Sequence, residues 1–119
     1  IIMPPGVQRK AVSNRLTDHG IGVSFADDPV QSIGISFSLK PDVILSNQEF
    51  TLISGFELAN MLAATQVTGK IPFALMTSHD DLSSSTTHAG STIGVIKKDS
   101  AFLDNISNYL RGVSLLAPN

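Results

Sequence analysis

The chain has 119 residues, of which 42% are hydrophobic and 15% charged, a composition that indicates one folded domain and excludes a disordered segment. Its formal net charge is -2, and it has no cluster of basic residues that would bind nucleic acid or anionic lipid. It has no cysteine, which excludes disulfides and thiolate metal sites. No apolar run reaches the roughly 18 to 20 residues of a membrane span, and no signal-peptide pattern is present, so we expect a cytoplasmic protein.

The first half of the chain alternates short apolar runs with helical periodicity. The apolar run Ile1–Met3, which two prolines end, predicts the end of a strand, and we expect the chain to be excised from a larger protein. Apolar spacing predicts a helix over Val7–His19, and strict alternation predicts a strand over Ile21–Ala26. An aspartate N-cap predicts a second helix over Pro29–Leu39, and the continuous apolar run Val43–Leu45 predicts a buried strand.

The second half repeats this alternation. Helices are predicted over Gly55–Thr65 and Ser100–Val113, and strands over Phe73–Met76 and Val95–Ile96. The stretch Thr77–Gly90 is rich in serine and threonine, so we expect the helix between these two strands to be short or irregular. Five strands that alternate with helices predict an α/β fold with a doubly wound parallel sheet, whose site lies beyond the carboxyl ends of the strands.

The segment Pro41–Asn47, with the sequence Pro-Asp-Val-Ile-Leu-Ser-Asn, carries a family resemblance. It is similar to the strand that ends in the phosphorylated aspartate of bacterial response-regulator receiver domains. Gly55 lies eight residues after Asn47, Thr77 ends the next strand, and Lys97 follows Gly90 at the spacing of the family's conserved glycine and lysine. The first-helix pattern is also matched, at Arg9, Val12, Leu16 and Gly20.

The resemblance covers essentially all of residues 1–119 as a single domain. It implies the CheY-like (flavodoxin-like) three-layer sandwich, with a five-stranded parallel sheet of strand order 2-1-3-4-5.

The same alignment places unusual residues at the positions that bind metal, accept the phosphoryl group and form the aromatic switch in the family. The acidic pair that binds magnesium is replaced by Met3 and Pro4, neither of which can ligate a hard cation. The phosphate acceptor is Asn47, whose amide is a poor nucleophile, and the aromatic switch residue is Gly94. The Met-Pro pair expected after the acceptor is replaced by Phe50-Thr51. The resemblance therefore implies a degenerate receiver without metal, cofactor or phosphorylation.

Four positions of the phosphorylation pocket remain as a vestigial site, at Asn47, Thr77, Ser78 and Lys97. One interpretation is inherited scaffolding, in which Lys97 bonds the side-chain carbonyl of Asn47. The other is anion binding, because the three lost carboxylates leave only the lysine charge. Glu49, two residues after Asn47, could partly restore negative charge. The loop His79–Asp81 is interpreted as solvated, since no second histidine lies at ligand spacing.

In receiver domains, the fourth helix, the fifth strand and the fifth helix form the surface that binds partners. Because we expect neither the aromatic switch nor a regular fourth helix here, we predict that a partner binds the first and last helices instead. Its candidate polar residues are Arg9, Asn105, Tyr109 and Arg111. We expect a non-enzymatic, bacterial signalling module of the two-component type, which binds a protein partner or an adjacent output domain, or dimerises. The alternatives are a sensor that binds an anion or a small ligand in the vestigial pocket, and a small flavodoxin-like hydrolase, which lacks a credible nucleophile.

Overall fold

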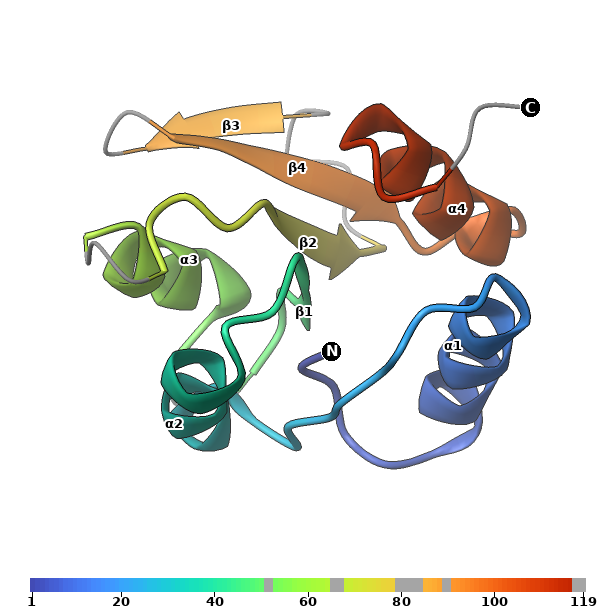
Figure 1. Cartoon of the computed structure of the whole chain (residues 1–119), viewed down its shortest axis with the longest axis horizontal. Helices are drawn as coiled ribbons and strands as arrows, with labels where there is room; N and C mark the ends of the chain where they lie inside the picture. The colour runs from blue at the N-terminus through green and yellow to red at the C-terminus, as the bar shows by residue number, and fades with distance from the viewer. Residues whose placement is uncertain (51–52, 65–67, 79–84, 89–90, 117–119) are drawn as a thin grey trace.

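The computed structural model describes residues 1–50, 53–64, 68–78, 85–88 and 91–116, and the side chains of 85–88, 91 and 92 are left out of the description. The described helices are α1 (Val7–Asp18), α2 (Pro29–Leu39), α3 (Gly55–Ala63) and α4 (Phe102–Gly112). The strands are β1 (Ile44–Asn47), β2 (Phe73–Thr77), β3 (Ser85–His88) and β4 (Ser91–Lys97). These elements have the order of an α/β fold in which helices cover both faces of a sheet (Figure 1).

The sheet differs from the predicted five parallel strands. Its order is β1-β2-β4-β3, with β1, β2 and β4 parallel. The two predicted strands at the start of the chain form only isolated bridges, from Ile2 to Ala26 on one side and from Ile2 to Ser46 on the other. The spatial sequence from Ala26 through Ile2 to β1, β2 and β4 still follows the predicted order. Because Pro4 and Pro5 end the first strand, Ile1–Met3 offers too few residues for a ladder on either side.

The segment between β2 and β4 also corrects the prediction of a short or irregular helix. Its described part, Ser85–His88, is strand β3, which pairs antiparallel with β4 from Ser85 opposite Gly94 to His88 opposite Ser91. Two adjacent threonines favour extended backbone, and the serines around them are poor helix formers. Ser85–His88 therefore extends the sheet in the segment where a helix was predicted.

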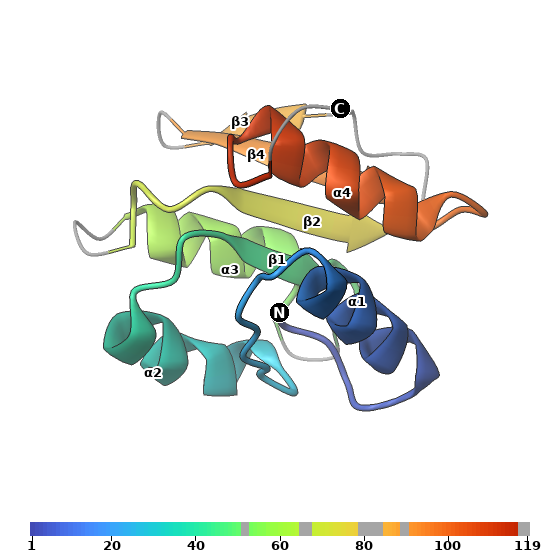
Figure 2. The ribbon, with the colours of Figure 1, turned by 45° about the vertical axis from the view of Figure 1, so that its right-hand side comes forward.

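Two apolar cores lie on the two faces of the sheet. One lies between the sheet and the helices α1 and α4, and the other between the sheet and α3, with α2 beside it (Figures 1 and 2). Successive β2 residues alternate between them, since Ala74 and Met76 pack in the first core and Phe73 and Leu75 in the second. All five residues of β2 are buried, as expected for a parallel strand covered on both faces.

Local signals position the helices as the sequence predicts. The Asp28 carboxylate accepts a hydrogen bond from the Gln31 N–H at 2.8 Å, with Pro29 at the first helical position of α2. Ser54 and Glu57 form a reciprocal capping box at the start of α3. Across the described ranges, no helix has the length and apolar character that crossing a membrane requires.

Candidate functional site

The structure brings the vestigial pocket residues to the carboxyl ends of three parallel strands. Asn47 ends β1, Thr77 ends β2 and Lys97 ends β4, and the sheet register pairs Thr77 with Lys97. Ser78 follows β2 and is exposed. Parallel strands end at one edge of the sheet, so these side chains share that edge, which is where ligands bind in doubly wound folds.

Asn47 occupies a closely packed position at this edge. Its side chain is only 8% exposed, and Oδ1 has no hydrogen-bond partner. The expected bond from Lys97 to this carbonyl is therefore not formed. Gly55 packs against the Asn47 backbone, because a β-carbon at position 55 would lie 2.3 Å from the Asn47 carbonyl oxygen. This close approach is the physical reason for a glycine eight residues after Asn47.

A carboxylate lies at the end of β2. Thr77, which is fully buried, donates a hydrogen bond from Oγ1 to Oε1 of Glu49 at 2.8 Å. Burial lowers the pKa of the nearby Lys98 ammonium, and the negative charge of Glu49 partly offsets that effect. Glu49 thus restores negative charge at the pocket edge, as the sequence had suggested it could.

Met3 and Pro4 occupy the positions that the resemblance gives to the acidic pair, and Met3 lies next to a cation. Met3 is buried in the core, whereas Pro4 is exposed. The Arg9 guanidinium donates to the Met3 carbonyl oxygen at 3.2 Å and pairs with the Asp27 carboxylate. It also lies 4.4 Å above the centre of the Phe25 ring. Arg9, a predicted residue of the partner surface, is engaged in these internal contacts.

No cluster of metal-ligating side chains stands out in the described part of the chain, where no three His, Asp or Glu residues gather. The loop His79–Asp81 lies outside the described residues.

An aromatic ring covers Gly94, the position that the resemblance gives to the aromatic switch residue. A β-carbon at Gly94 would lie 2.5 Å from Cε1 of Tyr109, so the ring packs directly on the β4 backbone. Tyr109 is half-buried, and its burial raises the pKa of the phenol to about 12. The sequence pointed to Tyr109 as a surface residue but carried no signal that it would face Gly94.

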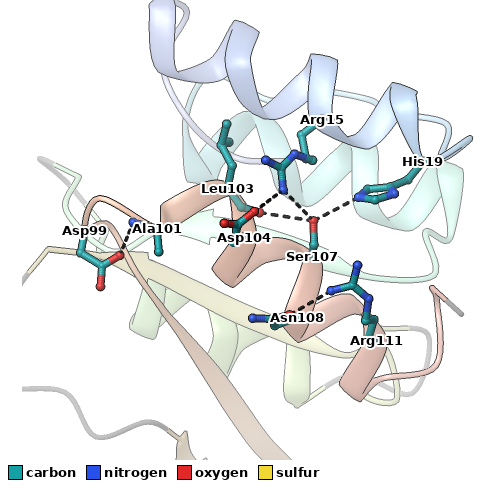
Figure 3. A network of polar contacts seen from close by, with 9 residues as sticks. All are labelled: Arg15, His19, Asp99, Ala101, Leu103, Asp104, Ser107, Asn108 and Arg111. Carbon is teal, nitrogen blue, oxygen red and sulfur yellow. Dashed lines mark hydrogen bonds and ion pairs between the residues drawn. The ribbon is translucent and has the colours of Figure 1, made fainter. Parts of the chain in front are cut away.

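Asn105 and Arg111, the other two predicted partner residues, have different surroundings. Asn105 donates from Nδ2 to the Lys97 carbonyl oxygen and to the Asp99 carboxylate, each at 3.0 Å, and so joins the end of β4 to α4. Arg111 donates to Oδ1 of Asn108 at 2.9 Å within α4 (Figure 3). Asn105 therefore supports the loop after Lys97, while Arg111 is partly buried, and its Nε has no hydrogen-bond partner among the described residues.

A polar network that the sequence did not predict joins α1 to α4 (Figure 3). Arg15 donates to the Asp104 carboxylate at 2.9 Å and to Ser107 Oγ at 3.2 Å, and His19 Nε2 lies 3.1 Å from the same hydroxyl. The Ser107 hydroxyl also lies 3.3 Å from the Leu103 carbonyl oxygen, to which it can donate. The Ser107 hydroxyl therefore joins Arg15 and His19 of α1 to α4.

Comparisons with known proteins show the fold. No family model matches the chain. It is 28% identical over 71 residues to a protein named "Probable transcriptional regulator ycf29" from Pyropia yezoensis, and it spans 32% of that protein's length. Two structures of the chemotaxis response regulator CheY4 of Vibrio cholerae are similar to this chain at 21% sequence identity. Each alignment covers 89% of this chain and 88% of the CheY4 chain. The TM-score is 0.72 for the first structure and 0.73 for the second, which was crystallised at low pH. The chain therefore has a CheY-like receiver fold.

Proposed function

We propose that this chain is a receiver-like signalling module that is not phosphorylated, has no enzymatic activity and acts by binding a protein partner or an adjacent output domain. The observation that carries the proposal is the hydrogen bond from Thr77 to Glu49, beside an asparagine in the acceptor position. The Thr77 hydroxyl therefore donates its proton to a carboxylate of the same domain, and not to a phosphoryl group.

The chemistry of phosphoryl transfer supports this assignment. The reaction needs an oxygen nucleophile and a metal ion that offsets charge on the transferred group. Asn47 supplies an amide, and Met3 and Pro4 supply no carboxylate to hold a divalent cation. Neither requirement is met by the residues at these positions.

The alternative of an anion sensor is less favoured by the same geometry. The Glu49 carboxylate and the unpaired Oδ1 of Asn47 are both acceptors, and both repel an anion. We therefore expect no saturable binding of inorganic phosphate in calorimetry, with or without the Lys97→Ala substitution. Saturable binding that Lys97→Ala abolishes would favour the sensor.

The α1–α4 side offers a surface for the partner. A shallow polar groove of about 520 Å³ lies between these helices, with Asp18, Asp104, Arg15 and Arg111 among its lining residues. Groups of both signs favour specific recognition of a partner with a complementary pattern. The name of the Pyropia yezoensis relative, a probable regulator, agrees with a module that controls another domain.

Phosphorylation can be tested directly by intact-mass measurement. The chain is incubated with acetyl phosphate and Mg²⁺, in parallel with the CheY4 response regulator as a positive control. We expect no added phosphoryl group on this chain under conditions that label CheY4. Acid-labile phosphate on the chain would refute the proposal.

The partner surface is tested separately by charge reversal in the groove. Arg111→Glu and Asp18→Lys should each weaken association with the full-length protein's output domain or with a second copy, measured by sedimentation velocity. Lys10→Glu, exposed and not part of the groove lining, is the control. Equal effects of all three changes would place the contact on another face.

A further inference from the structure

The outer face of α2 is apolar although it is exposed. Val30, Gly34 and Phe37 recur at the spacing of one helix face, and the exposed fraction is 59% for Val30 and 39% for Phe37. On the opposite, buried face lie two serines, Ser32 and Ser36. A helix with one face on a core and the other in water normally has the reverse arrangement, with its polar residues outside. The pattern of α2 is instead typical of a helix that is packed on both sides.

The inner side of α2 fixes this orientation. The Ser32 hydroxyl donates to the Pro29 carbonyl oxygen at 2.6 Å, so the buried polar group is satisfied within the helix. Ile33 and Ile35, which flank the outer face, pack against the core beneath α2. A rotation of the helix that buried Val30 would turn Ile35 into solvent. The apolar outer face therefore cannot be hidden within the domain itself.

The distribution of charge on α2 indicates what covers this face. No charged residue lies between Pro29 and Leu39. The charges lie at the two ends, where Asp28 is the N-cap and Lys40 the C-cap, and both residues are exposed. Neither side chain belongs to an ion pair with another described residue. An uncharged apolar face with one acidic and one basic end is complementary to a copy of itself turned end to end.

We propose that α2 packs antiparallel against α2 of a second copy of this chain, around a two-fold axis at Gly34. Asp28 and Lys40 lie at equal distances along the chain on either side of Gly34. In an antiparallel pair the Asp28 carboxylate of one copy therefore meets the Lys40 ammonium of the other, and the symmetry produces this contact twice. Val30 lies opposite Ser38 of the second copy by the same rule, and the opposed helix dipoles add a further attraction.

Gly34 allows the two helices to approach closely. A β-carbon at this position would meet nothing within 4 Å, so the space above the helix is open. Val30 and Phe37 stand on either side of the gap that the glycine leaves. Ridges of one helix pack into such gaps of another. Glycine is unfavourable inside a helix, and close approach of a second backbone is a role that its missing side chain fulfils.

This surface goes beyond the proposed function, because it is separate from the groove between α1 and α4. The two surfaces lie on opposite faces of the sheet, and α2 lies at the edge of the molecule in both ribbon views (Figures 1 and 2). A helix of this length extends only about 16 Å. The interface is therefore smaller than that of stable dimers, and we expect a weak dimer in exchange with monomer.

The association is measured by sedimentation equilibrium of the full chain from about 10 μM to about 1 mM, the range of weak complexes. Val30→Glu places a charge in the apolar interface and should raise the dissociation constant of the dimer at least about ten-fold. Val7→Glu is the matched control, because Val7 is likewise an exposed valine in the first turn of a helix, here α1. It should leave the dimer unchanged. A chain that stays monomeric throughout this range, or equal effects of the two substitutions, would overturn the proposal.

The antiparallel arrangement is tested by the charges at the ends of α2. Lys40→Asp brings two carboxylates together at each end and should weaken the dimer at least about three-fold. Asp28→Ser removes one of these charges and keeps a good N-cap, so the double variant should regain part of the lost affinity. Both residues are exposed, so the fold should not be affected. A dimer that Lys40→Asp does not weaken would contradict the antiparallel pairing and overturn the proposal.

Amide NMR shifts on dilution identify the face that associates. We expect concentration-dependent shifts at Val30, Gly34 and Phe37. Shifts confined to α1 and α4 would assign self-association to the groove between those helices and overturn the proposal for α2, while leaving the proposed function intact.

Discussion

The ring of Tyr109 lies over the backbone of Gly94, at a distance where a β-carbon on residue 94 would be only 2.5 Å from Cε1. The glycine is the condition for this contact, because any side chain there would displace the ring. The contact joins α4 to β4 at the position that the receiver family gives to a movable aromatic residue. In this chain the aromatic comes from the helix and is packed in place.

The contact predicts a specific response to Gly94→Ala. The added methyl group must displace the Tyr109 ring, and such overpacking costs about 1 to 3 kcal/mol in the free energy of unfolding. Urea denaturation measures this cost. Gly34→Ala in α2 is the matched control, because nothing lies within 4 Å of a β-carbon there and alanine favours the helix. If the two substitutions had equal effects, the ring would not be held against Gly94.

The double variant Gly94→Ala/Tyr109→Ala tests the same contact from the other side. Removing the ring should remove the clash, so the two single effects should not add. Simple additivity would contradict a direct contact between the two residues.

Burial of Tyr109 predicts an alkaline transition that can be observed directly. The chain has one tyrosine and no tryptophan, so ultraviolet absorbance reports this phenol alone. We expect a titration midpoint of about 12 in the folded protein, against about 10 for the solvated phenol in denaturant. Because the folded pKa is raised, the associated stability is present below pH 10 and is lost as the pH rises toward 12. A midpoint near 10 in the folded protein would show that the phenol is solvated.

The network between α1 and α4 predicts that a buried hydroxyl matters more than an ion pair. Ser107→Ala removes the hydroxyl that contacts both Arg15 and His19, at a cost of about 0.5 to 1.5 kcal/mol in unfolding free energy. Asp104→Ala removes an ion pair whose carboxylate side chain is 72% exposed, and should cost at most about 1 kcal/mol. Thermal or urea unfolding of both variants decides this, and a larger loss for Asp104→Ala would contradict the ranking.

The carboxylate at the end of β2 predicts a change in the titration of Lys98. Glu49→Gln removes the negative charge that raises the pKa of this lysine, so its pKa should fall further below the ordinary value. Heteronuclear NMR of the lysine side chains follows the titration. Asp42→Asn is the control, since Asp42 does not contribute to the shift at Lys98. An unchanged Lys98 titration in Glu49→Gln would place the carboxylate away from the pocket.

Restoring the acceptor alone should not restore phosphorylation. Asn47→Asp supplies a carboxylate, but Met3 and Pro4 still provide no metal ligand and Arg9 still lies beside them. We expect no phosphoryl group by intact mass after treatment with acetyl phosphate and Mg²⁺. Phosphorylation of Asn47→Asp would contradict this expectation. It would show that the asparagine at position 47 alone prevents phosphorylation of the chain.

The sequence by itself determined the four described helices, the buried strands β1 and β2, and the edge on which the candidate site lies. Periodicity and the Asp28 cap are local signals, and the register of parallel strands brings Asn47, Thr77 and Lys97 to one edge once the alternation of elements is known. The sequence indicated only that Glu49 could bring negative charge to the pocket. It did not predict the hydrogen bond from Thr77 to Glu49, because the two residues are 28 positions apart in the chain.

Only the tertiary structure decided how the ends of the sheet are built and what fills the space around the site. The first two predicted strands form single bridges because Pro4 and Pro5 end Ile1–Met3, which offers too few residues for a ladder. Ser85–His88 joins the sheet because β4 offers an edge. Ser107 meets His19 across 88 residues, and Tyr109 meets a glycine that carries no side chain to signal the contact. Packing between segments distant in the chain leaves no periodic pattern in the sequence, so it appears only when the chain is folded.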